Sequence, residues 1–173
     1  MCYRARAAEF GISLAEYIRR LVSRDLGEDR GVSDPQALFD LGDSIFYAAA
    51  DRGDRSNERA KQIIAGGERL VTSDHVLVET WLLLAHRLGR NAAEQYWGAI
   101  RRGASFVEPV TLADLEVAFA IGEGFHDQDF SIVDRTSFAV MQRLGVFRAA
   151  TLDEHFAIFR FGPDRRRAFE IVR

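Results

Sequence analysis

Short apolar runs alternate with longer amphipathic stretches along most of the chain. The apolar runs predict strands at residues 37–41, 69–72, 105–110 and 147–150, with a weaker strand near the C-terminus. Between them, apolar positions recur with helical spacing at about residues 44–50, 55–65, 74–88, 92–101, 112–122 and 134–144. Strands separated by helices need crossover connections, so the pattern predicts an α/β fold with a parallel sheet.

A polar stretch, GEDRGVSDPQ at residues 27–36, divides the chain. Its glycines, proline and charges leave little to bury, which is typical of a linker. The preceding residues, 1–26, have helical periodicity, and Ser13 and Glu16 have the spacing of a capping box at a helix start. We therefore expect a short helical segment at 1–26, a linker, and one α/β domain at 37–173.

The bulk composition narrows the class of protein. The chain has 173 residues, of which 47% are hydrophobic, enough for one folded domain with an added element. Its net charge of -3 gives no overall basic field, so contact with nucleic acid must come from a local patch or through metal ions. Cys2 is the only cysteine, which excludes a disulfide framework and a thiolate zinc cluster. Without a signal peptide or membrane-spanning run, we expect a cytoplasmic protein.

Several acidic residues fall where predicted strands end or where helices begin. Two lie at the end of the first strand, one lies in the apolar helix after the second, one opens a later helix, and one follows the fourth strand. In that order they are Asp40 and Asp43, Glu79, Asp134, and Asp153. The carboxyl ends of parallel strands meet at one edge of a sheet, where such folds bind their ligands. These acids are therefore expected to converge.

Each acid taken alone has a simpler explanation. Asp43, Asp134 and Asp153 precede helical sequence, where aspartate commonly serves as an N-cap. Glu79 is flanked by apolar residues, where burial is costly unless the carboxylate is paired with an arginine or faces water. Acids at four separate junctions nevertheless favour a site for a hard cation, because such cations prefer oxygen ligands.

Four segments together resemble a known family. They are SIFYAAADRGDRSNERA with an acid just before it, TSDHVLVETWLLLAHRLG, DQDFSIVDRTSFAVMQRLG and ATLDEHF. In their order and spacing, residues 43–156 resemble the PIN-domain ribonucleases, in particular the toxin component of VapBC toxin–antitoxin modules. The resemblance covers nearly the whole chain after the linker.

This resemblance implies a PIN-like three-layer domain, in which helices flank a central parallel sheet. It implies the toxin of a type II toxin–antitoxin system, an endoribonuclease that hydrolyses RNA phosphodiesters with water activated by Mg²⁺ or Mn²⁺. The family's metal ligands correspond here to Glu79, Asp134 and Asp153. An RNA substrate, a cognate antitoxin and a homodimer are implied as well.

The first metal ligand of the family has no single counterpart in this chain. Family members place an aspartate five residues before the position of Tyr47, which is Gly42 here. Asp43 lies one residue later and is favoured because the glycine permits a turn, while Asp40 is the second candidate. The third possibility is a catalytically impaired PIN-like binding or regulatory module, whose first ligand is lost at Gly42.

Other side chains can support such a site. Ser44 and Thr136 are candidates for hydrogen bonds to a ligand carboxylate or to water on the metal, although N-capping explains each equally well. His155 can orient its loop or contact phosphate, but a structural or exposed histidine is the commoner case. The arginines at 165–167 can track RNA phosphates, although a short arginine run is usually a solvated surface.

The N-terminal segment carries its own resemblance. Its sequence, RARAAEFGISLAEYIRRLVSRDLG, resembles the helical part of ribbon-helix-helix antitoxins, without the preceding strand that those proteins insert into DNA. Three explanations remain open. The first two are a fusion whose helices pack on the toxin domain and a reading frame extended upstream into an antitoxin gene. Plain amphipathic helices that pack against the core are the third.

Overall fold

The computed structural model describes residues 36–40 and 45–173, and only the backbone of Asp40. All of these residues belong to the unit Asp34–Arg173. The predicted helical segment at 1–26 lies outside the described residues, as do Gly42, Asp43 and Ser44.

The described chain forms one five-stranded parallel sheet, in the order β3-β2-β1-β4-β5. The strands are β1 (Leu38–Asp40), β2 (Leu70–Ser73), β3 (Phe106–Glu108), β4 (Arg148–Ala150) and β5 (Glu170–Val172). β1 lies in the middle, where Leu38 pairs with Leu70 of β2 and with Arg148 of β4. The α/β class and the parallel sheet predicted from the hydrophobic pattern are therefore confirmed.

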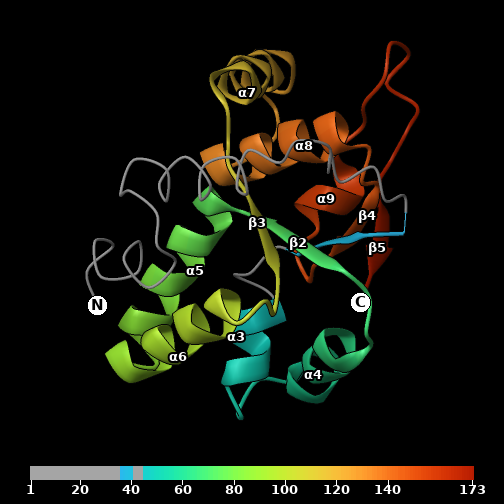
Figure 1. Cartoon of the computed structure of the whole chain (residues 1–173). Helices are drawn as coiled ribbons and strands as arrows, with labels where there is room; N and C mark the ends of the chain where they lie inside the picture. Colours follow the sequence, from blue (N-terminus) through green and yellow to red (C-terminus); the bar gives the residue numbers. More distant parts are fainter. Residues whose placement is uncertain (1–35, 41–44) are drawn as a thin grey trace, which may run out of the picture. The chain divides into compact units, whose positions relative to one another are not determined.

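Helices cover both faces of this sheet (Figure 1). They are α3 (Ile45–Ala50), α4 (Asn57–Ala65), α5 (Asp74–Arg87), α6 (Arg90–Arg101), α7 (Leu112–Gly124), α8 (Ile132–Leu144) and α9 (His155–Ile158). Figure 1 shows α3, α4 and α6 below the sheet, α8 and α9 above it, and α7 against α8. In the described part of the chain, no helix is long and apolar enough to cross a membrane.

Successive side chains of the short strands point to opposite faces of the sheet and belong to two hydrophobic cores. Leu38 and Leu70 belong to the core under α3, α4 and α6, together with Phe46 and Tyr96. Their neighbours on β1 and β2 are also fully buried and face the other way, because successive strand residues point to opposite faces. That second core is built from stacked and edge-on phenylalanines of α8, α9 and the C-terminal segment: Phe138, Phe156, Phe159, Phe161 and Phe169.

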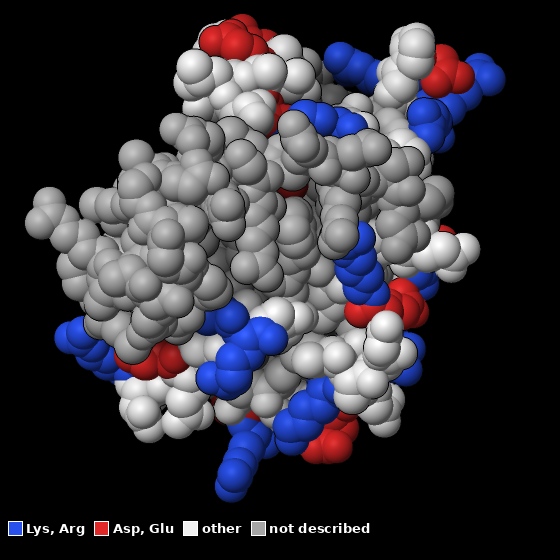
Figure 2. Space-filling model, viewed as in Figure 1, with Lys and Arg blue, Asp and Glu red and all other residues white. Residues whose placement is uncertain are grey.

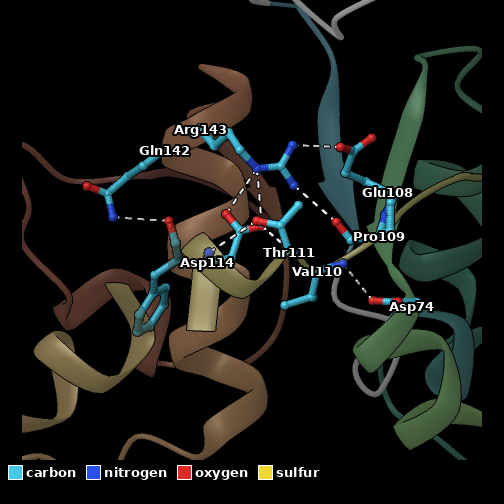
Figure 3. Close-up of polar contacts among 9 residues, drawn as sticks. Asp74, Glu108, Pro109, Val110, Thr111, Asp114, Gln142 and Arg143 are labelled. Atoms are coloured by element: carbon cyan, nitrogen blue, oxygen red, sulfur yellow. Dashed lines mark hydrogen bonds and ion pairs between the residues drawn. The ribbon is translucent and has the colours of Figure 1, made fainter. Parts of the chain in front are cut away.

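Arg143 near the end of α8 joins this helix to α7 and to the end of β3 (Figure 3). Its Nε donates to both carboxylate oxygens of Asp114, at 3.0 and 3.2 Å. Its Nη1 donates to Glu108 at 2.7 Å and its Nη2 to the carbonyl of Pro109 at 3.1 Å. Asp114 also closes a capping box with Thr111 at the start of α7. One guanidinium therefore fixes the position of the helix whose other end carries Asp134.

The carboxylate of Asp114 is only 3% exposed. Burial alone would raise its pKa, but the hydrogen bonds from Arg143 and from Thr111 outweigh burial and lower the pKa. Asp114 is therefore ionised in the folded protein at neutral pH, and its charge is matched by Arg143.

We predict that Asp114→Asn destabilises the protein by about 3 kcal/mol at pH 7, because Arg143 then keeps its charge without its most buried partner. A carboxyl whose pKa is lowered on folding adds stability above its ordinary value of 3.8, and this contribution is lost as the pH falls through the folded value. The difference in free energy of unfolding between the variant and the wild type should therefore disappear as the pH falls below about 4. Urea unfolding at several pH values measures it.

Glu116→Gln is the matched control, since Glu116 is an exposed acid on the same helix. Its free energy of unfolding should stay within about 0.5 kcal/mol of the wild-type value. An equal loss in both variants would show that the Arg143 contacts are not what holds α7 to α8.

Candidate functional site

Asp134 lies in the first turn of α8. Ser131 is the N-cap of this helix, and its hydroxyl accepts the backbone N–H of Asp134 at 3.0 Å. The Asp134 carboxylate accepts the backbone N–H of Ser131 at 2.8 Å in return. The simpler explanation that Asp134 is itself the N-cap is therefore wrong: this acid is the third helical residue, held by a capping box.

Asp153 lies in the turn between β4 and α9. Its backbone N–H donates to the hydroxyl of Thr151 at 2.9 Å, and the Thr151 side chain is fully buried behind it. One carboxylate oxygen, Oδ1, accepts the backbone N–H of His155 at 2.8 Å. These two bonds set the direction of the Asp153 side chain before any ligand is considered.

The structure brings these two carboxylates together with His155. One ligand atom from each of Asp134, Asp153 and His155 lies within 4.8 Å of the others. The imidazole Nδ1 of His155 is 3.1 Å from Oδ2 of Asp134 and 3.4 Å from Oδ2 of Asp153. Side chains of His155 and Asp153 are about one-third exposed, at 33% and 32%, so the cluster opens to solvent.

Glu79 of α5 completes the group of described acids. Burial raises the pKa of its carboxyl, and the negative charges of Asp134 and Asp153 raise it further. No arginine or lysine forms an ion pair with Glu79 among the described residues, so the simpler explanation of a salt bridge is not supported. The charges of Asp134 and Asp153, which come from separate parts of the sequence, therefore act on Glu79 in the folded chain.

A hollow of about 380 Å³ lies beside this acid. Its described lining is His75, Val78, Glu79 and Leu82 of α5 and Val133 of α8. Apart from Glu79 and the imidazole of His75, the lining is apolar. Glu79 thus borders an open space between α5 and α8, and Asp134 and Asp153 are not among its described lining residues.

The donor set fits a divalent cation. It consists of carboxylate oxygens with a net negative charge, and the raised pKa of Glu79 indicates that the folded protein disfavours a further charge there. A cation bound among these oxygens relieves that repulsion. Asp134 and Asp153 are described residues that could hold it, with His155 beside them. Glu79 lies outside that group, and its link to the two acids is the effect of their charges on its pKa. β1, whose end carries Asp40, lies between β2 and β4.

The remaining predicted residues are placed as follows. The Thr136 side chain is buried, donates to the carbonyl of Val133 at 3.1 Å and lies 3.3 Å from Nδ1 of His75. Its support of the metal site stays a prediction, as does that of Ser44. His155 is where sequence reasoning fell short, because it contacts both acids; the signal was its two-residue spacing from Asp153.

Two of the three arginines at residues 165–167 contact aromatic rings of the folded domain. Arg165 lies over the ring of Phe125 at 4.7 Å, and Arg167 lies over Phe147 at 4.6 Å. The side chain of Arg166 is 85% exposed, beside Asp164. In Figure 2 this hairpin shows blue and red atoms side by side, so its charges are mixed.

Comparisons with known proteins agree with this geometry. Residues 43–162 match the PIN domain. The chain belongs to the PIN-domain family. The "23S rRNA-specific endonuclease VapC20", from two strains of Mycobacterium tuberculosis, is 42% identical over 123 residues, which is 69% of this chain and 92% of the relative.

A crystal structure of Mycobacterium tuberculosis VapC20, described as a Sarcin-Ricin loop cleaving toxin, is similar as well. It has a TM-score of 0.64 and 36% identity to this chain, and the match covers 69% of this chain and 92% of that one. These findings confirm the PIN fold and support a nuclease toxin of the VapC type. They do not favour the catalytically impaired alternative.

We predict that Glu79→Gln stabilises the metal-free protein at pH 7. The pKa of Glu79 is raised on folding, so its ionisation costs stability as the pH rises above its ordinary value of 4.5. Removing the charge removes that cost. The urea midpoint of the chelator-treated variant should exceed that of wild type at pH 7, and the difference should vanish below about pH 4.5.

Glu123→Gln serves as the control, because Glu123 is an exposed acid on α7. It should leave the midpoint unchanged at both pH values. A Glu79→Gln protein no more stable than wild type at pH 7 would contradict the mutual repulsion of the three acids.

Proposed function

We propose that this chain is a divalent-metal-dependent endoribonuclease and the toxin of a type II toxin–antitoxin system. The observation that carries the proposal is the close approach of Asp134 and Asp153 beside His155, together with the effect of both charges on the pKa of Glu79 in α5. The chain is also similar to the 23S rRNA-specific endonuclease VapC20 over 92% of the length of that relative, which supports RNA as the substrate class.

The proposed metal ligands are Glu79, Asp134 and Asp153, with Asp43 as the fourth and Asp40 as the alternative. The PIN match begins at residue 43, so Asp43 lies inside the matched range and Asp40 outside it. That difference favours Asp43. Mg²⁺ is the proposed ion, with Mn²⁺ as a substitute, because both suit carboxylate oxygens.

The chain's own residues prepare the site for phosphodiester hydrolysis. A divalent cation, when bound, acidifies water and offsets the charge that develops on the phosphate. The capping box of α8 and the turn after β4 hold Asp134 and Asp153 in place, so little reorganisation is needed when substrate arrives. Because water is the proposed nucleophile, the products carry a 5′-phosphate and a 3′-hydroxyl, and no histidine base is required.

For the target, we propose the sarcin-ricin loop of 23S rRNA, the RNA named for VapC20. The net charge of -3 means that attraction to RNA must be local, through exposed arginines such as Arg166 and through the metal. A cognate antitoxin, a homodimer and a cytoplasmic location are proposed on the same likeness. The helical segment at 1–26 is proposed as a remnant or fusion of an antitoxin.

We predict that Asp134→Asn, Asp153→Asn and Glu79→Gln each slow cleavage of a sarcin-ricin loop RNA by at least about 100-fold, because each removes charge that holds the cation. A chelator should abolish cleavage by wild type, and added Mg²⁺ should restore it. Gel analysis of end-labelled RNA measures both the rate and the 5′-phosphate product.

The control for this assay is Asp129→Asn, since Asp129 is an exposed acid in the loop before α8. It should cleave at the wild-type rate. Undiminished cleavage by the chelated protein and by Asp134→Asn would defeat the metal mechanism.

The first ligand can be identified by the same assay. We predict that Asp43→Asn abolishes cleavage and that Asp40→Asn does not. The reverse pattern would assign the role to Asp40. If the wild-type protein is inert and Gly42→Asp gains activity, the chain is instead the impaired module considered above.

A further inference from the structure

We propose that His155 is a positioning residue, which holds Oδ2 of Asp134 through its ring and Oδ1 of Asp153 through its main chain, and leaves Oδ1 of Asp134 for the cation. This inference rests on the proposed function, since it concerns the ligands Asp134 and Asp153. It departs from the expectation for His155 from sequence, which favoured a structural or exposed side chain.

The first support is the pair of contacts that His155 makes. Its ring Nδ1 lies 3.1 Å from Oδ2 of Asp134, and its backbone N–H donates to Oδ1 of Asp153 at 2.8 Å. The same residue therefore fixes both carboxylates, one through its side chain and one through its main chain. These bonds hold α8 and the turn after β4 in a fixed position relative to each other.

The second support is the direction of the hydrogen bonds. Both groups that face Nδ1 are carboxylate oxygens, and an ionised carboxylate only accepts hydrogen bonds. Nδ1 must therefore be a donor in this arrangement, and a nitrogen that carries hydrogen offers no lone pair to a metal. The geometry makes His155 an organiser of the ligands and not a ligand through Nδ1.

The third support is what remains available on Asp134. Its Oδ2 accepts two donors, the backbone N–H of Ser131 at 2.8 Å and Nδ1 of His155. No hydrogen bond within the described residues engages its Oδ1. Such a carboxylate presents one oxygen in a fixed direction, as a preorganised cation ligand requires.

The imidazole is itself held by the aromatic core. The ring of Phe130 meets it edge-on, with 5.3 Å between centroids and an 80° angle. Phe130 in turn packs against Phe138 of α8 and against Phe159, at 5.2 and 6.0 Å. The second core thus reaches the acids through His155, which limits the rotation of the ring.

Two substitutions separate the hydrogen bond from the packing. His155→Phe keeps a ring against Phe130 and loses the donor, whereas His155→Asn keeps an amide nitrogen near the place of Nδ1. We expect His155→Phe to bind Mn²⁺ about 10- to 100-fold more weakly than wild type in calorimetric titration of the intact protein. His155→Asn should recover most of that affinity, and His126→Phe, at an exposed histidine, should not change it.

The outcomes distinguish this inference from the proposed function. Failure of the wild-type protein to bind Mn²⁺ would refute the metal site itself. Normal binding by wild type and by His155→Phe alike would overturn only the positioning role. Nitrogen coupling to Mn²⁺ in pulsed electron paramagnetic resonance, present in wild type and absent in His155→Phe, would make His155 a direct ligand and would also overturn it.

Discussion

Repulsion between carboxylates is the interaction on which this structure depends. Asp134 and Asp153 lie together beside His155, and the pKa of Glu79 is raised by burial and by the charges of these two acids. A folded protein keeps such a group only where the remaining structure holds it in place. Here the capping box of α8 and the contacts of Thr151 and His155 provide that restraint.

The rest of the fold can be understood as the support of this edge. Five short parallel strands bring the starts of their following helices together, and a core on each face keeps the sheet buried. Arg143 fixes the far end of α8 through Asp114 and Glu108, so the helix that carries Asp134 is held at both ends. The contacts of Arg143 therefore both stabilise the fold and hold the helix that carries Asp134.

Much of this arrangement could be predicted from the sequence. The alternation of apolar runs with helical periodicity predicted the strands and helices, because the inner strands β1 and β2 are buried on both faces and the long helices bury one side. The short helix α9 was missed, since four residues are too few to show a helical period. The topology also predicted that Glu79, Asp134 and Asp153 converge; the structure brings Asp134 and Asp153 together, and their charges raise the pKa of Glu79.

Other features could not be predicted. The contact of His155 with Asp134 joins residues 21 positions apart, and it depends on the packing of Phe130 and on the turn after β4. The simpler explanation of Asp134 as an N-cap is wrong, because Ser131, three residues earlier, is the N-cap and Asp134 closes the capping box. The Ser131–Asp134 spacing is that of a capping box, which is a local signal, whereas the contact with His155 depends on the tertiary fold.

The most direct test of the account is anomalous X-ray scattering from crystals of the protein soaked in Mn²⁺. The account predicts an anomalous peak within coordination distance of carboxylate oxygens from Glu79, Asp134 and Asp153. Density elsewhere, or an empty site with these acids turned away from one another, would contradict it.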